Sequence, residues 1–221
     1  MIKAIIFDFG RVISAQKPMS LFWDYEEALG LAPGVLNRVM FGSESWQQVL
    51  VGQKALDDYW LEIGPALGLH TPDAIQSFRQ QYFADEAIND AVLGLIDRLH
   101  GRYKLAILSN APPRLTQWLA DWEILDLFDV VVCSGDEGVA KPDPAIFELT
   151  LARLDVAAEE AVFIDDSPGH VRAAQALGLH GVHFTTAEAL DRQLDALLGT
   201  EAGIARPVEP PRSEGSARES T

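Results

Sequence analysis

Residues 1–14 read MIKAIIFDFGRVIS, and this opening stretch sets a pattern that returns along the chain. Residues 2–7 form a short run rich in isoleucine, which is typical of a strand buried on both faces of a parallel sheet. The run ends at the carboxylate of Asp8, and Gly10 follows two places later. Taken alone, Asp8 is most simply interpreted as a turn or cap residue.

Four further apolar runs and the helical patterns between them indicate the fold class. Helical segments with apolar stripes or an early proline occupy residues 89–100, 112–122, 143–154 and 167–178. Strands that alternate with helices of this length are typical of repeated βαβ units. The sequence therefore predicts an α/β fold with a doubly wound, Rossmann-like parallel sheet. The four later strands are expected at KLAIL (104–108), VVVC (130–133), AVFI (161–164) and GVHF (181–184).

The segment between the first two strands is too long for one crossover helix. Residues 15–84 contain several helix-like pieces and no strand pattern, so we expect an inserted helical cap there. The α/β core is then expected to consist of residues 1–14 and 85–199. Residues 200–221 are poor in apolar residues and rich in proline, serine and charge, a composition that predicts a disordered tail.

Composition excludes several classes of function. The chain has 221 residues, with 17 Lys and Arg against 33 Asp and Glu, and a net charge of −16. Such a charge argues against nucleic acid and anionic membranes as partners. No apolar run approaches the roughly 18 to 20 residues of a membrane helix. The single cysteine, Cys133, is expected to be a buried thiol and fits a cytoplasmic location. No prediction of the oligomeric state follows.

Polar side chains follow four of the predicted strands. In open parallel sheets, ligands bind beyond the carboxyl ends of the strands, so side chains placed there are expected to meet. Each has an ordinary interpretation as a turn or surface residue. The adjacent pair Asp165 and Asp166 is the least ordinary, because neighbouring carboxylates at a buried strand end repel unless a cation or a donor holds them. The residues concerned are Asp8, Ser109, Asn110, Lys141, Asp165 and Asp166.

This set of residues suggests a phosphoryl-transfer mechanism. Asp8 and Asp166, with a backbone carbonyl and waters, supply the hard oxygen ligands that Mg²⁺ prefers. Neutralisation of a phosphate would permit attack by the Asp8 carboxylate, and water would then hydrolyse the aspartyl-phosphate. Ser109 and nearby amides would hold phosphoryl oxygens, while Lys141 would balance the charge.

Four motifs, in order, resemble those of the haloacid dehalogenase (HAD) superfamily of hydrolases. They are IIFDFG, LAILSN, VAKPD and VFIDDS, and the resemblance covers residues 1–199. The insertion resembles the small helical cap of that family, which closes over the site and selects the substrate. The resemblance implies that Asp8 is the nucleophile. It also implies that the metal binds Asp8, the main-chain oxygen of Gly10 and Asp166, with Asp165 as a further ligand or a supporting group.

Gly10 departs from the usual family pattern. Phosphatases of the family generally have a second aspartate there as general acid and base, a role worth about 10² to 10⁴ in rate. A subgroup that resembles alpha-D-glucose-1-phosphatase also has glycine, which keeps phosphatase activity tenable and suggests a sugar phosphate. His170 and Glu44 are candidates to replace this aspartate. The simpler interpretations are that His170 lies on the first turn of a helix and that Glu44 is solvated.

Three residues are predicted to contact substrate. They are Asn110, Arg11 and Trp46. Arg11 stands where the family has a small or uncharged residue, so it either binds a second anionic group or is solvated. A tryptophan such as Trp46 is more often packing, and Trp118 and Trp122, four apart, are interpreted as core.

The leading hypothesis is a Mg²⁺-dependent hydrolase of a small phosphorylated metabolite. One alternative is a 2-haloacid dehalogenase with the same nucleophile, which the paired Asp165 and Asp166 disfavour. The other is a catalytically weak binding or regulatory module of the same fold, which Gly10 motivates.

Overall fold

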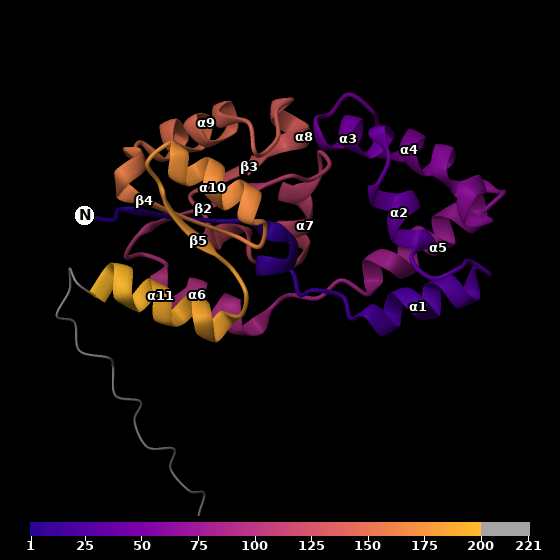
Figure 1. Ribbon diagram of the computed structural model, residues 1–221, viewed down its shortest axis with the longest axis horizontal. Helices are drawn as coiled ribbons and strands as arrows, with labels where there is room; N and C mark the ends of the chain where they lie inside the picture. Colours follow the sequence, from indigo (N-terminus) through magenta and orange to yellow (C-terminus); the bar gives the residue numbers. More distant parts are fainter. Residues whose placement is uncertain (200–221) are drawn as a thin grey trace, which may run out of the picture.

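The structure, a computed structural model, describes residues 1–199, so the predicted disordered tail lies outside the described residues. Five strands form one parallel sheet in the order β3-β2-β1-β4-β5 (Figure 1). This arrangement confirms the predicted doubly wound α/β fold. The strands are β1 (Ala4–Phe7), β2 (Lys104–Ser109), β3 (Val130–Cys133), β4 (Ala161–Asp165) and β5 (His180–His183).

Helices cover both faces of the sheet, which explains why its strands are apolar without alternation. Ile5 and Phe7 of β1 belong to one hydrophobic cluster, whereas Ala4 and Ile6 belong to the other. One face packs against α6 (Asp90–Leu99), α7 (Leu115–Asp121) and α11 (Ala187–Gly199). The opposite face packs against α9 (Pro144–Leu154) and α10 (Pro168–Ala176).

The segment after β1 folds into helices that have a hydrophobic core of their own. Five of the twelve buried residues of that core are aromatic, and they include Tyr25, Tyr59, Trp60 and Phe78. Figure 1 shows this lobe beside the α/β core. Its helices are α1 (Met19–Ala28), α2 (Val35–Phe41), α3 (Glu44–Leu50), α4 (Leu56–Ile63), the 3₁₀ turn η2 (Gly64–Leu67) and α5 (Pro72–Ala84).

The chain leaves and re-enters the α/β core through two paired segments. Ser14 and Ile88 form an antiparallel bridge, and the backbone N–H of Ala15 donates to the carbonyl of Ala87 at 2.7 Å. Because the two crossings are hydrogen-bonded to each other, they form a natural boundary. We therefore propose that residues 15–84 are the cap.

A second contact joins the cap to the core at α8 (Ser134–Glu137). The hydroxyl of Ser134 donates to the carbonyl of Leu50 at 2.5 Å. A Cβ atom added at Gly52 would lie 2.2 Å from the carbonyl oxygen of Gly135, so the two backbones meet more closely than side chains would allow. The cap therefore contacts the core at a second place, which is distant in the sequence from the two paired segments that connect the cap to the core.

Several elements were not predicted from the sequence. They include α8, α11 and a helical turn at Phe9–Ile13 directly after β1. The helix expected over residues 112–122 begins only at Leu115, because two consecutive prolines precede it. Within residues 1–199, none of the helices has the length and apolar character that crossing a membrane requires.

Candidate active site

Three central strands bring the predicted residues to one edge of the sheet. Asp8 follows β1, which lies between β2 and β4. Ser109 is the last residue of β2, and Asp165 is the last residue of β4. Parallel strands end on the same side, so these side chains meet although more than a hundred residues separate Asp8 from Asp165.

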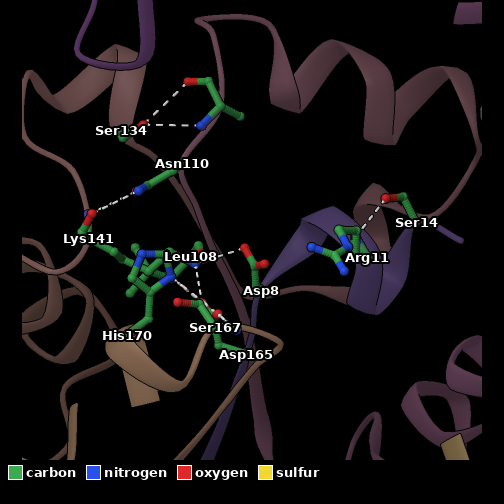
Figure 2. A network of polar contacts seen from close by, with 11 residues as sticks. Asp8, Arg11, Ser14, Leu108, Asn110, Ser134, Lys141, Asp165, Ser167 and His170 are labelled. Carbon is green, nitrogen blue, oxygen red and sulfur yellow. Dashed lines mark hydrogen bonds and ion pairs between the residues drawn. The ribbon is translucent and has the colours of Figure 1, made fainter. Parts of the chain in front are cut away.

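Lys141 lies at the centre of this group (Figure 2). Its Nζ atom donates to Oδ1 of Asp8 at 2.8 Å, to Oδ2 of Asp165 at 2.7 Å and to the carbonyl of Leu108 at 2.9 Å. Lys141, Asp8 and Asp165 are all buried. A buried ammonium needs this many acceptors to offset its desolvation. The lysine therefore fixes the two carboxylates relative to each other.

Asn110 holds Lys141 in place. Its amide nitrogen donates to the carbonyl of Lys141, and its amide oxygen accepts from the N–H of Lys141, both at 2.8 Å. Both ends of the side chain are therefore engaged by backbone. Asn110 also lines the cavity described below, and its contact with substrate stays a prediction.

Burial and the charge of Lys141 act in opposite directions on the pKa of Asp8. Burial, together with the negative charges of Asp165 and Asp166, raises the pKa of Asp8 to about 6, although Lys141 acts in the opposite direction. Burial by itself would lower the pKa of Lys141, but Asp8 and Asp165 outweigh it and raise that pKa. A further cation beside Asp8 would stabilise its carboxylate.

Asp165 accepts hydrogen bonds from three directions. Besides Lys141, the N–H of Ser167 donates to its Oδ1 at 2.7 Å, and Nδ1 of His170 lies 3.0 Å from its Oδ2. Burial would raise the pKa of Asp165, but His170 and Lys141 outweigh it and lower that pKa. His170 thus contacts Asp165 and is not among the residues that line the cavity described below, and Glu44 is exposed.

The donor set fits a hard divalent cation. Carboxylate oxygens of Asp8, Asp165 and Asp166 all lie within 4.8 Å of one another. Three carboxylates with no nitrogen or sulfur ligand are the chemistry that Mg²⁺ prefers. Gly10 follows in the turn after β1, where its backbone offers a carbonyl close to the same edge. These residues would hold Mg²⁺ between them.

Arg11 occupies an unusual backbone conformation beside this cluster. Its φ of 61° is left-handed, a region that costs a non-glycine residue free energy. Its guanidinium lies 3.0 Å from Oδ2 of Asp166, and its side chain is 61% exposed. In this structure the largely exposed Arg11 side chain pairs with a predicted metal ligand, and its contact with a second anionic group of the substrate stays a prediction.

A cavity of about 680 Å³ opens between the cap and the sheet edge, where Phe9 and Gly10, the two residues after Asp8, line it. Gly10, Ser109 and Asn110 line its core end, and Trp46 lines it from the cap. Trp118 and Trp122, which the sequence predicted as core, also line the cavity. Both tryptophans are half-buried: one part of each side chain packs against the core, and another part lines the cavity. Helical spacing alone could not distinguish packing in the core from lining the cavity.

Cys133 lies apart from this chemistry. It is buried, and its thiol donates to the carbonyls of Ala111 and Pro112, each at 3.2 Å. Burial raises its pKa to about 11, so the group stays a neutral thiol.

Comparisons with known proteins agree on one family. Residues 2–178 match the family model described as haloacid dehalogenase-like hydrolase. The chain is 31% identical over 202 residues to the sesquiterpene phosphatase astK of Aspergillus oryzae, covering 89% of this chain and 97% of that protein. It is 26% identical over 206 residues to drimenol cyclase drtB of Aspergillus calidoustus, covering 91% of this chain but only 38% of that longer protein.

The fold is also shared with a solved structure. It is the wild-type HAD family enzyme bt-2542 of Bacteroides thetaiotaomicron, in complex with magnesium and inorganic phosphate. The TM-score is 0.67 at 21% sequence identity, and the alignment covers 84% of this chain and 95% of that one.

Proposed function

The chain belongs to the haloacid dehalogenase-like hydrolase family, and we propose that it is a Mg²⁺-dependent phosphomonoester hydrolase that acts through an aspartyl-phosphate on Asp8. The observation that carries this proposal is the buried contact of Asp8 with Lys141, next to a cluster of three carboxylates. Lys141 and Arg11 offset part of the negative charge, but three carboxylates with two cations leave a net negative charge that would repel an anionic substrate. A divalent cation bound to these carboxylates would offset that repulsion.

The residues of this chain have distinct parts in the reaction. The Asp8 carboxylate attacks phosphorus and displaces the alcohol, and water then attacks the resulting acyl phosphate to release inorganic phosphate and restore the carboxylate. Lys141 orients Asp8 and balances negative charge, and Ser109 at the cavity end donates to a phosphoryl oxygen. Mg²⁺, held by Asp8, Asp166 and the Gly10 carbonyl with support from Asp165, would neutralise charge on the transferred phosphoryl group.

Protonation of the leaving group has no dedicated residue. Gly10 has no side chain, and the carboxylates that line the cavity within residues 1–199 are Glu86 and Asp121. Glu86 pairs with Lys17 at 2.8 Å, and Asp121 accepts a hydrogen bond from Gln117 at 2.8 Å. We propose that neither acts as the general acid, and we therefore expect esters with good leaving groups to react fastest.

The test is release of phosphate from p-nitrophenyl phosphate, with Mg²⁺ and with EDTA. We expect release in Mg²⁺ and a loss of at least about 100-fold in EDTA, because the carboxylate cluster then lacks its cation. Halide release from 2-chloropropionate without metal would instead favour the dehalogenase alternative. Phosphate binding without turnover of any ester would favour the weak binding module.

Two finer points remain proposals. We propose that the substrate is a small phosphorylated metabolite. The resemblance to the alpha-D-glucose-1-phosphatase subgroup suggests a sugar phosphate. We also keep the cytoplasm as the proposed location, on the ground of the single buried Cys133.

Arg11→Asn should tighten Mg²⁺ binding up to about fivefold, because the guanidinium competes with the metal for Asp166 and such partly exposed pairs are worth up to about 1 kcal/mol. Asparagine tolerates the left-handed backbone at this position. The measurement is isothermal titration of the metal. Arg153→Asn, which removes a surface pair with Glu137, is the matched control. Weaker or unchanged binding in Arg11→Asn would show that Arg11 does not compete with the metal.

A further inference from the structure

The cavity beside the nucleophile extends far beyond a phosphate site. It runs from Gly10 and Ser109 at the sheet edge to Trp46 and Leu56 of the cap. Its volume of about 680 Å³ lies within the usual range of roughly 300 to 1,000 Å³ for small-molecule pockets. A phosphoryl group next to Asp8 would fill only the end nearest the sheet. The remaining space is available to the leaving group.

Aromatic rings form much of the cavity wall. Phe9 stacks on Trp122 with ring centroids 5.5 Å apart, and Phe83 packs against Trp118 at 5.7 Å. Trp46 of α3 also lines the cavity, and its ring packs against those of Phe41 and Tyr59. Trp46, Phe83, Trp118 and Trp122 are half-buried, so part of their apolar surface is left uncovered by protein. Covering such surface with an apolar ligand is favourable.

The polar groups of the wall are largely engaged elsewhere. The guanidinium of Arg79 forms an ion pair with Asp57 of α4 at 2.8 Å and lies over the ring of Trp60. Glu86 and Asp121 have the partners described above. A sugar needs several free donors and acceptors around its hydroxyls, since each unpaired hydroxyl in a closed pocket is costly. Among the other polar groups, Asn110 is engaged by Lys141, the Tyr59 hydroxyl donates to the Met40 carbonyl and Ser14 accepts from the N–H of Arg11. The rest include the exposed Gln76, Gln80 and Arg114, the hydroxyls of Tyr82 and Ser109, and the indole N–H of Trp60, which has no hydrogen-bond partner among the described residues.

We propose that the substrate is a phosphomonoester of an alcohol with a bulky hydrocarbon body, which binds in the aromatic cavity while its phosphate lies at Asp8. This inference rests on the proposed function, because it names the substrate class of the same site. Trp46, Trp118 and Phe83 select the leaving group by apolar contact. The reaction releases the free hydrocarbon alcohol and inorganic phosphate.

The experiment uses competition, so that it does not depend on how fast each ester turns over. Hydrolysis of p-nitrophenyl phosphate in Mg²⁺ reports the proposed function itself. Octyl phosphate, ethyl phosphate and glucose 6-phosphate are added as competitors, below the micelle concentration of the octyl ester. We expect octyl phosphate to compete at least about 100-fold better than ethyl phosphate, since each buried methylene is worth roughly a fourfold gain.

Variants then locate the binding surface. Trp46→Ala should reduce the preference for octyl over ethyl phosphate at least about tenfold, and Trp46→Phe should keep most of it. Trp23→Ala is the matched control, because Trp23 is a cap tryptophan that is 58% exposed and does not line the cavity. Thermal melting of each variant separates a loss of preference from a loss of fold.

The outcomes distinguish the two proposals. Equal or better competition by glucose 6-phosphate or ethyl phosphate, with p-nitrophenyl phosphate still hydrolysed, would overturn the apolar leaving group and leave the proposed function intact. If folded Trp46→Ala still prefers octyl over ethyl phosphate as strongly as the wild type does, the proposal that the aromatic wall at Trp46 binds the hydrocarbon body is wrong. No hydrolysis of any phosphate ester would overturn the proposed function, and the substrate inference with it.

Discussion

Asp8→Asn is expected to lower the rate of phosphate release by at least about 10⁴-fold, because an amide cannot act as the attacking nucleophile. Asn has nearly the shape of Asp, so the packing at the end of β1 should survive. Its amide oxygen can still accept from Lys141, which keeps its contacts with Asp165 and the Leu108 carbonyl. The measurement is single-turnover release of phosphate from p-nitrophenyl phosphate in Mg²⁺.

The same variant should be more stable than the wild type in metal-free buffer at pH 7. The pKa of Asp8 is raised from 3.8 to about 6 in the folded protein, so its carboxylate is less favourable there than in the unfolded chain. That penalty develops as pH rises from about 4 to 6 and is fully present at pH 7. Removing the charge should add about 3 kcal/mol to the free energy of unfolding, since each unit of pKa corresponds to about 1.4 kcal/mol.

A control and a covalent measurement sharpen this prediction. Asp97→Asn, at an exposed position of α6, should change neither activity nor stability measurably. Acid quenching of the wild type during turnover should trap one phosphoryl group on the peptide that contains Asp8, as read by mass spectrometry. Phosphate release by Asp8→Asn at a rate close to that of the wild type would show that the reaction does not pass through this carboxylate.

The sequence predicts the sheet and its carboxyl edge well, because both follow from local pattern. Strands buried on both faces are continuous apolar runs, and the runs of β1, β2 and β4 lead directly into the residue that lies at the edge. Asp8, Ser109 and Asp165 therefore meet as the order of motifs indicated. Helices α8 and α11 were missed, the first because a four-residue helix has too few residues for a periodic signal.

What the sequence could not provide is the direction of each side chain. In this structure Asn110 is engaged by the backbone of Lys141 and Arg11 by Asp166, contacts that the sequence pattern did not indicate. Trp118 and Trp122 belong to the core by spacing, yet each also presents ring surface to the cavity. A residue can have both roles because α5 of the cap and α7 of the core are far apart in the sequence and come together only in the folded protein.

Gly10→Asp is expected to raise turnover of alkyl phosphates by about 10²-fold or more, because it would supply the missing general acid and base. The backbone at Gly10 has φ −65° and ψ 124°, which any residue adopts. No atom lies within 4 Å of a Cβ built there, so the side chain has room at the wall of the cavity. The gain should require Mg²⁺, since a fourth carboxylate adds repulsion to the cluster of Asp8, Asp165 and Asp166.

The leaving group shows whether proton transfer is the cause of this gain. p-Nitrophenolate leaves without a proton, so the formation of the aspartyl-phosphate from its ester should change little in Gly10→Asp, while the same step with octyl phosphate should accelerate. Gly10→Asn is the matched control, because it has the same size and no carboxyl group. An equal gain in Gly10→Asn would mean that the side chain acts by packing. No gain in folded Gly10→Asp would mean that leaving-group protonation does not limit this enzyme, and that a glycine at this position costs it nothing in rate.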